Sequence, residues 1–114
     1  MIKGYFLVSK NEKLNSIIEK ILINCHRTVI VVEKKKVLGL ISEGDILKAL
    51  LYKKNVNVTA INLMNKSFKF LKKKDDNEAK KIFQKNLCSL IPIVNSNMIL
   101  KDLFTLEKFL LKIK

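Results

Sequence analysis

The chain has 114 residues, enough for one compact domain that buries a core of its own. Its formal charge is +13, from 23 Lys and Arg residues against 10 Asp and Glu residues. Hydrophobic residues make up 48% of the chain, which excludes disorder, and no apolar run reaches the roughly 20 residues that cross a bilayer.

Residues that bind metals or carry out catalysis are scarce. Cys25 and Cys88 form no C-x-x-C pair, and His26 is the only histidine. A zinc site takes about four such ligands, so we expect no metal site, no catalytic constellation and no required cofactor. The N-terminal residues lack the apolar core of a signal peptide. We therefore expect a cytoplasmic, non-catalytic protein with free thiols and no membrane association.

Lysine supplies nearly all of the positive charge, because Arg27 is the only arginine. Proteins that recognise bases or clamp phosphates favour arginine, whose planar group binds in a bidentate manner. We interpret the lysines as solvated surface residues, which argues against nucleic acid as a partner. A basic nucleic-acid-binding protein stays open as an alternative.

The first half predicts a strand, a helix, a hairpin and a second helix. Residues 5–8 form a short β-type run, and a helix is expected to begin near residues 11–14. The β-branched run at 28–32 and the apolar run at 37–41 flank a charged turn and predict a buried hairpin, and a helix follows from 42 to 51. The first helix has apolar residues at helical spacing: Leu14, Ile17, Ile18 and Ile21.

The middle of the chain predicts a polar connector at 52–58 and a short helix at 59–64, capped by Thr59. No Gly-, Ser- or Pro-rich linker separates the halves. We expect residues 1–58 and 59–114 to form two repeats of one compact module.

The second half repeats the order of the first. We expect a strand at 68–71, a helix that begins at residues 75–76, a hairpin of strands at 90–94 and 98–104, and a helix from 105. The sequence therefore predicts an α/β fold of the α+β type. It contains two β-α-β-β-α repeats related by approximate two-fold symmetry.

Two alignments of the halves are possible. The buried strands lie 62 residues apart, whereas Thr105 lies 63 residues after Ser42, so one alignment needs an extra residue in the second hairpin. The ungapped alignment instead pairs Asp45 with Glu107 and Ser42 with Phe104. We favour the gapped alignment because it places a capping residue at both helix starts, and the other stays open.

Several segments resemble the CBS domain family. Residues 37–46 match its signature of an apolar pair, Gly, two apolar residues, Thr or Ser, two variable residues and Asp; 91–95 and 61–66 resemble its Pro-Val-Val-Asp strand and the stretch before a second repeat. The resemblance implies a tandem CBS pair, or Bateman module. Residues 42–51 and 101–103 are similar to CBS pairs found beside sugar-nucleotidyltransferase domains, which implies such a domain as a fused or separate partner.

The Ser42-x-x-Asp45 segment has two interpretations. It is close to a plain capping box, which any sharp strand-to-helix turn can contain. The start of a helix also attracts phosphate, and a carboxylate accepts hydrogen bonds from hydroxyls. The resemblance implies that Ser42 binds phosphate and Asp45 binds the ribose of AMP, ADP or ATP, while Gly44 leaves room for the ligand.

The resemblance also implies companions for this site around the base and its edge, with Lys10 or Arg27 adding charge against phosphate. These companions are Leu7, Val8, Arg27, Thr28 and Val29.

A second site is expected near Thr105, Lys108, Leu71 and Ile91. Thr105 keeps the hydroxyl, but Lys108 replaces the acid, and an ammonium donates hydrogen bonds only. Lys108 is therefore either a phosphate contact or a solvated surface lysine.

The two helices that follow the signatures carry more apolar residues than one core needs, and in the family similar helices form a dimer surface. We expect a homodimer. The sequence thus favours a regulatory module that binds an adenine nucleotide or related ligand between two repeats and signals to an attached or partner domain. A purely structural dimerisation module without a ligand is the main alternative.

Overall fold

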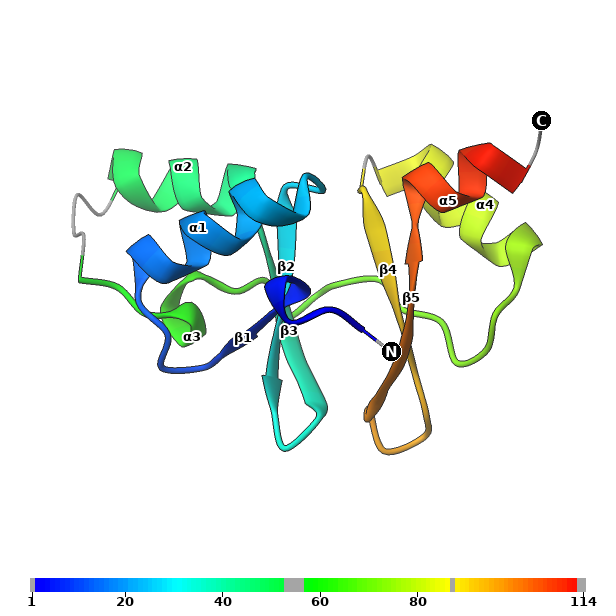
Figure 1. The fold of residues 1–114 in the computed structure, drawn as a ribbon, viewed down its shortest axis with the longest axis horizontal. Coiled ribbons are helices and arrows are strands. Elements are labelled where there is room, and N and C mark those ends of the chain that lie inside the picture. Colours follow the sequence, from blue (N-terminus) through cyan, green and yellow to red (C-terminus); the bar gives the residue numbers. More distant parts are fainter. Residues whose placement is uncertain (1, 53–56, 87, 113–114) are drawn as a thin grey trace.

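The computed structural model describes residues 2–52, 57–86 and 88–112, which form two halves lying side by side (Figure 1). The first half contains the 3₁₀ turn η1 (Gly4–Phe6), β1 (Leu7–Ser9), α1 (Leu14–Asn24), β2 (Thr28–Glu33), β3 (Lys36–Ser42) and α2 (Glu43–Tyr52). The rest contains α3 (Ala60–Leu63), α4 (Asp76–Asn86), β4 (Leu90–Val94), β5 (Leu100–Thr105) and α5 (Leu106–Lys112). This α/β arrangement confirms the predicted fold class.

The first sheet has the order β1-β2-β3, with β1 parallel and β3 antiparallel to β2. Its central strand is buried because β-branched residues fill it, as the sequence predicts. The helix α1 lays its apolar stripe on this sheet, where Leu14, Ile17 and Ile21 are buried. The strand β1 is shorter than predicted, since Gly4–Phe6 form a 3₁₀ turn.

The second sheet contains only β4 and β5, so the predicted strand at 68–71 is wrong. Leu71 alone pairs, through a bridge to Ile93. Its amide donates to the Pro92 carbonyl at 3.0 Å, and its carbonyl accepts from the Val94 amide at 2.8 Å. The preceding residues Lys69 and Phe70 are exposed, so they gain nothing from joining the sheet.

The strand register selects the gapped alignment of the halves. Thr28 pairs with Ser42 in the first hairpin, and Leu90 pairs with Thr105 in the second. Ser42 and Thr105 therefore occupy matched positions, each the last residue of its strand. Residues after these two match at the same spacing, so Lys108 stands where the first half has Asp45.

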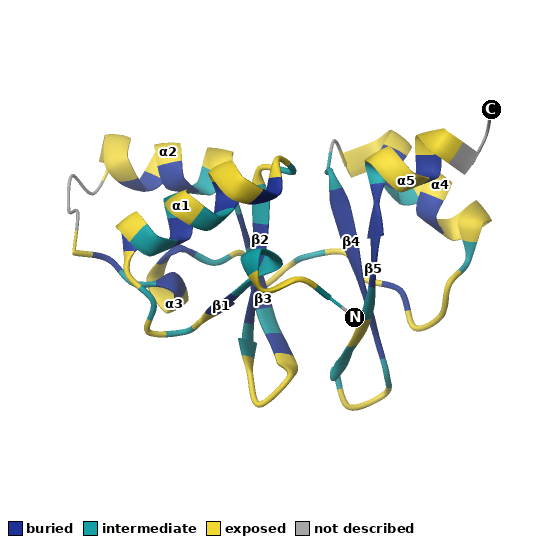
Figure 2. Cartoon of the chain, viewed as in Figure 1, coloured by how far each residue is buried: buried dark blue, intermediate teal, exposed yellow. Residues whose placement is uncertain are grey.

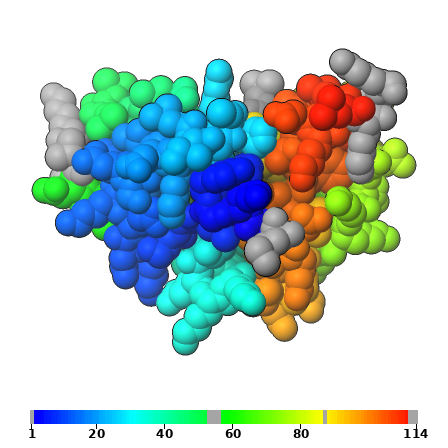
Figure 3. Space-filling model, in the orientation of Figure 1, coloured from blue at the N-terminus to red at the C-terminus, as the bar shows by residue number. Residues whose placement is uncertain are grey.

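The halves share a core and a backbone connection. Ile30, Leu90 and Leu103 are buried together between the sheets. Near the hairpin turns, the Leu100 amide donates to the Lys35 carbonyl at 2.8 Å, and the Val37 amide donates to the Met98 carbonyl at 2.9 Å. Space-filling Figure 3 shows the N-terminal segment lying against both halves.

The short helix α3 packs with the first half, where Val58, Ala60 and Leu63 join its core. The Ala60 amide donates to the Glu12 carbonyl at 2.9 Å. The division at residue 58 stays a prediction, and residues 53–56 of the predicted connector lie outside the described residues.

The long helices lie toward one end of the strands and the hairpin turns lie at the other end, with α1 and α2 flanking the first sheet and α4 and α5 flanking the second sheet on the opposite side of the molecule (Figure 1). The outer faces of these helices are exposed in Figure 2. The exposed leucines of this helical face are Leu22, Leu47, Leu50, Leu51, Leu110 and Leu111. None of the helices in the described ranges is long and apolar enough to cross a membrane.

Candidate functional site

Ser42 and Asp45 are brought together at the turn from β3 into α2. The Ser42 amide and hydroxyl both donate to Asp45 Oδ2, at 2.9 and 3.0 Å, and the Asp45 amide donates to Ser42 Oγ at 3.2 Å. This reciprocal arrangement is a capping box. Both hydrogen bonds that the Asp45 carboxylate accepts from Ser42 end on Oδ2. The other carboxylate oxygen has acceptor capacity of its own. The cap therefore leaves this group able to accept from a ligand.

The backbone around this turn is open and well anchored. Gly44 is exposed, and a Cβ placed there meets only Ser42 Oγ, at 3.7 Å. The Glu43 amide donates to the Arg27 carbonyl at 2.9 Å, and at the matched place the Leu106 amide donates to the Ser89 carbonyl at the same distance. Each helix start is thus tied to the residue that precedes the first strand of its own hairpin, β2 or β4.

The predicted companions of Ser42 fall into two groups. Val8 and Val29 are buried in the first core, and Leu7 packs in the core between the halves, so packing accounts for all three. Arg27 is exposed with a φ of 59°, while Lys10 forms an ion pair with Glu33 at 3.2 Å. Thr28 contacts the second half instead, through its Oγ1 at 3.4 Å from Ser89 Oγ.

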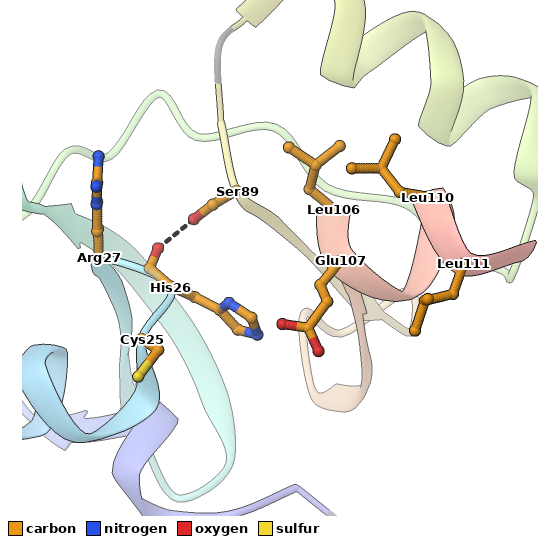
Figure 4. Close-up of a pocket in the computed structure, with 8 residues that line it drawn as sticks. All are labelled: Cys25, His26, Arg27, Ser89, Leu106, Glu107, Leu110 and Leu111. Carbon is orange, nitrogen blue, oxygen red and sulfur yellow. Dashed lines mark hydrogen bonds between the residues drawn. The ribbon is translucent and has the colours of Figure 1, made fainter.

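Two cavities lie where the halves meet, near the start of α5. The larger, of about 600 Å³, lies between the loop before β2 and α5, and Figure 4 shows the His26 ring and the Glu107 carboxylate facing one another across it. Its other lining residues are Cys25, Arg27, Ser89, Leu106, Leu110 and Leu111. Ser89 Oγ donates to the His26 carbonyl, which ties the halves at this point.

The smaller cavity, of about 390 Å³, contains the second signature. Thr105 and Lys108 line it, and the Lys108 amide donates to Thr105 Oγ1 at 3.2 Å. Leu71 and Ile91, predicted at the same site, are buried in the second core and line neither cavity. Neither cavity is lined by Ser42 or Asp45.

The first half supplies lining residues that the sequence did not point to: Lys3, Tyr5, Phe6 and His26. They come from the N-terminal segment and from the loop before β2, yet they face the second signature. Local patterns predict elements and not which half each element faces, so no signal within either half indicates these residues.

Asp102 is the acid of the smaller cavity. Burial raises its pKa, but the Leu103 amide, which donates to Oδ1 at 2.7 Å, and Lys74, at 3.3 Å from Oδ2, hold that pKa below its ordinary value. Cys25 is an exposed free thiol, and burial raises the pKa of the Cys88 thiol. Within the described ranges, no group of three His, Cys, Asp or Glu residues is placed to hold a metal.

Comparison with known proteins identifies the fold. The family model described as the CBS domain matches residues 1–52. A protein from Methanocaldococcus jannaschii is similar in structure, with a TM-score of 0.84 and 20% identity, over 95% of this chain and 44% of that one. The chain folds as a CBS domain pair.

Two further structures support that assignment. A CBS domain protein from Pyrobaculum aerophilum, complexed with AMP, has a TM-score of 0.77 and 15% identity, over 98% of this chain and 92% of that one. The cytosolic domain of the Mg²⁺ channel MgtE, in complex with ATP, has a TM-score of 0.74 and 14% identity, over 97% of this chain and 45% of that one. A sequence comparison with curated proteins finds no match. The chain thus spans less than half the length of two of these structures.

Proposed function

We propose that this CBS pair is a non-catalytic regulatory module that binds an adenine nucleotide or a related ligand between its halves. The observation that carries the proposal is the pair of cavities whose walls combine residues from both halves. A ligand held there stabilises one packing of the halves relative to others. The change in packing between the ligand-free and ligand-bound halves would in turn alter the conformation or activity of an attached or partner domain.

The structural neighbours support an adenine nucleotide as the ligand. The Pyrobaculum protein carries AMP, and the MgtE domain carries ATP. Both share this fold over nearly the whole chain, and CBS domains are generally regulatory rather than catalytic.

The approximate symmetry supports a nucleotide site at Ser42 and Asp45. Thr105 and Lys108 line the smaller cavity, and Ser42 and Asp45 occupy the matched positions in the strand register of the first half. There Asp45 would accept from the two ribose hydroxyls, and Ser42 would turn its one hydroxyl hydrogen from Asp45 Oδ2 to a phosphate oxygen. Gly44 gives access to the backbone, and the exposed Arg27 supplies positive charge.

Calorimetry with AMP, ADP and ATP tests this site. Hydrogen bonds to a charged group are worth about 1.5–3 kcal/mol, so Asp45→Ala should weaken binding by roughly one to two decades. The wild type should bind 2′,3′-dideoxy-AMP more weakly than AMP by a similar factor. Asp75→Ala, which removes the carboxylate that caps α4, is the matched control and should leave affinity unchanged.

Two results would contradict the proposal. One is a wild-type protein that binds no adenine nucleotide at millimolar concentration. The other is an Asp45→Ala variant with unaltered affinity, which would move the ligand elsewhere.

A homodimer formed through the helical face is a second proposal, favoured by the exposed leucines there. Leu47 and Leu111 are 58% and 63% exposed, and apolar patches of this kind mark interaction surfaces. Light scattering at micromolar concentration should give twice the mass of one chain, and Leu47→Lys with Leu111→Lys should restore the monomer. A sugar-nucleotidyltransferase partner and a cytoplasmic location stay predictions.

A further inference from the structure

The segment that joins the halves, residues 64–74, carries five lysines and no acid. It crosses from the first half to the second (Figure 1). Asn65 forms a bridge to β3 and Leu71 forms a bridge to β4, and the residues between these two bridges belong to no helix or strand. The backbone of this joining segment is therefore held at both ends, while the stretch between carries its side chains outside regular structure.

Two phenyl rings lie together in the middle of the joining segment. The ring centroids of Phe68 and Phe70 are 5.8 Å apart, with an interplanar angle of 55°. Phe68 packs against the core between the halves, which holds it in place, whereas Phe70 is 37% exposed. An exposed ring beside an anchored one offers a fixed flat surface on which an unpaired base can stack.

Four lysines of the joining segment are exposed and form no ion pair within the described part of the chain. The fifth, Lys74, approaches Asp102 Oδ2 at 3.3 Å. The next acid along the chain, Asp75, accepts from the Asn77 and Glu78 amides and so serves the start of α4. Positive charge on both sides of the rings is thus left for a partner. The four lysines are Lys66, Lys69, Lys72 and Lys73.

This combination of exposed ring and unpaired lysines favours single-stranded nucleic acid over other polyanions. Bases stack on aromatic side chains while phosphates meet the ammonium groups, and a duplex keeps its bases out of reach of such a ring. An anionic bilayer would take up several apolar side chains, but Phe68 is committed to the core and leaves Phe70 alone to insert. Lysine is a point charge without the planar fork of arginine, so the bases would not be distinguished.

We propose that the joining segment binds single-stranded nucleic acid without sequence preference, by stacking a base on Phe70 and holding phosphates with its four unpaired lysines. None of these side chains lines either cavity, so the inference is independent of the proposed nucleotide site. The scarcity of arginine argues against a protein that reads bases. It does not argue against attraction between lysines and phosphates.

Fluorescence anisotropy of the full chain with a labelled oligothymidylate of about 15 nucleotides tests this surface. The single strand should bind at least about fivefold more tightly than a duplex of the same length. Each phosphate neutralised on a single strand contributes about −0.7 to the slope of log K against log salt concentration. Four lysines therefore predict a slope of about −3.

Two variants separate stacking from charge, and each changes only exposed side chains. Phe70→Ala should weaken binding by at least about fivefold and leave the salt slope unchanged. Lys69→Gln combined with Lys72→Gln should weaken binding and bring the slope to about −1.4. Thermal unfolding of both variants checks that the fold is retained.

Matched controls come from the helices. Lys80→Gln combined with Lys85→Gln removes the same charge from exposed positions on α4, and Tyr52→Ala removes an exposed ring from α2. Both should change affinity less than about twofold at an ionic strength of about 0.15 M, where charges further away than about 8 Å are screened.

Four results would overturn the inference. The first is tight binding of the duplex, and the second is unaltered affinity in Phe70→Ala. The third is an equal loss in the two double lysine variants, which would mean that only the net charge of the chain attracts the probe. The fourth is binding to vesicles of phosphatidylserine and phosphatidylcholine in the absence of oligonucleotide binding, which would assign the surface to a membrane instead.

Discussion

The two halves share a strand register but differ at the turn that follows each hairpin. In the first half, Ser42 and Asp45 bind one another reciprocally. In the second half, there is one such bond, from the Lys108 amide to Thr105 Oγ1, and Lys108 lines the smaller cavity. A turn can therefore keep its capping hydroxyl while the residue one turn on acquires the opposite charge.

The interiors of the halves also differ. The first core is aliphatic, whereas the second contains a cluster of Phe83, Phe104 and Phe109 with ring centroids 5.7–6.1 Å apart. The second sheet has two strands where the first has three, and the aromatic cluster packs in the core of the half with the smaller sheet. Matched backbones thus tolerate different side chains as long as the buried volume is filled.

The largest effect is expected from the aromatic cluster. Phe104→Ala should lower the free energy of unfolding by about 3–5 kcal/mol, because it leaves a cavity and removes two ring contacts. Ile41→Ala, at the matched buried position of the first half, should cost about 1 kcal/mol less. Urea unfolding monitored by circular dichroism measures both. An equal or larger cost for Ile41→Ala would show that the second core does not depend on its rings.

A smaller effect is expected where the segment that follows α3 passes beside β3. A Cβ on Gly39 would lie 2.9 Å from the Asn65 carbonyl oxygen and 3.0 Å from Met64 Cβ. Two backbone hydrogen bonds between Leu40 and Asn65 hold this segment against β3, so Gly39→Ala should cost about 1–3 kcal/mol of unfolding free energy.

The matched residue in the second half is Asp102, whose side chain is 47% exposed. Asp102→Ala should therefore change unfolding free energy by no more than about 0.5 kcal/mol. Thermal unfolding of both variants tests the difference. Equal losses of unfolding free energy in the two variants would mean that the close backbone approach at Gly39 is not the cause of its cost.

The capping residues should differ little from one another. Ser42→Ala should cost about 1 kcal/mol, because the Asp45 amide loses its acceptor and Asp45 Oδ2 loses one of its donors. Ser42→Thr imports the capping residue of the second half and should stay within about 0.5 kcal/mol of wild type. Chemical denaturation resolves these values. A large cost for Ser42→Thr would contradict the equivalence of the two turns.

The smallest expected effect is the loss of stability that Glu12 contributes when the pH is lowered. Burial raises the pKa of Glu12, but hydrogen bonds from Ser16, Lys20 and the Ser9 amide together hold that pKa below its ordinary value of 4.5. A lowered pKa stabilises the fold above pH 4.5, and this contribution disappears as the pH falls through the lower, folded-state pKa. At the matched position the second half has Lys74, so only the first half has this pH-dependent contribution to stability at that position.

Glu12→Gln should therefore lower the unfolding free energy at pH 7 by about 0.5–1 kcal/mol. The difference from wild type should shrink below pH 4.5. Glu19→Gln on the exposed side of α1 is the control. Unfolding curves from pH 7 to pH 3 test this, and a difference that grows towards acid would contradict the assigned direction.

Much of the fold could be predicted from the sequence, because the deciding signals are local. The helical spacing of Leu14, Ile17 and Ile21 correctly indicates the buried face of α1. The β-branched density at 28–32 indicates a central strand. The strand predicted at 68–71 failed, because only Leu71 has a neighbour with which to pair. An apolar pattern predicts a strand only where a partner edge lies within reach.

The sequence by itself determined the two repeats, their 62-residue spacing and the capping residues Ser42 and Thr105, since each depends on residues close in the chain. The tertiary structure alone decided which first-half residues lie in the cavity of the second signature. It placed Phe6 and His26 beside Lys108, and it committed Val8 and Val29 to the core. These outcomes follow from packing between segments that are distant in the chain, where each side chain goes to whichever surface buries its apolar area.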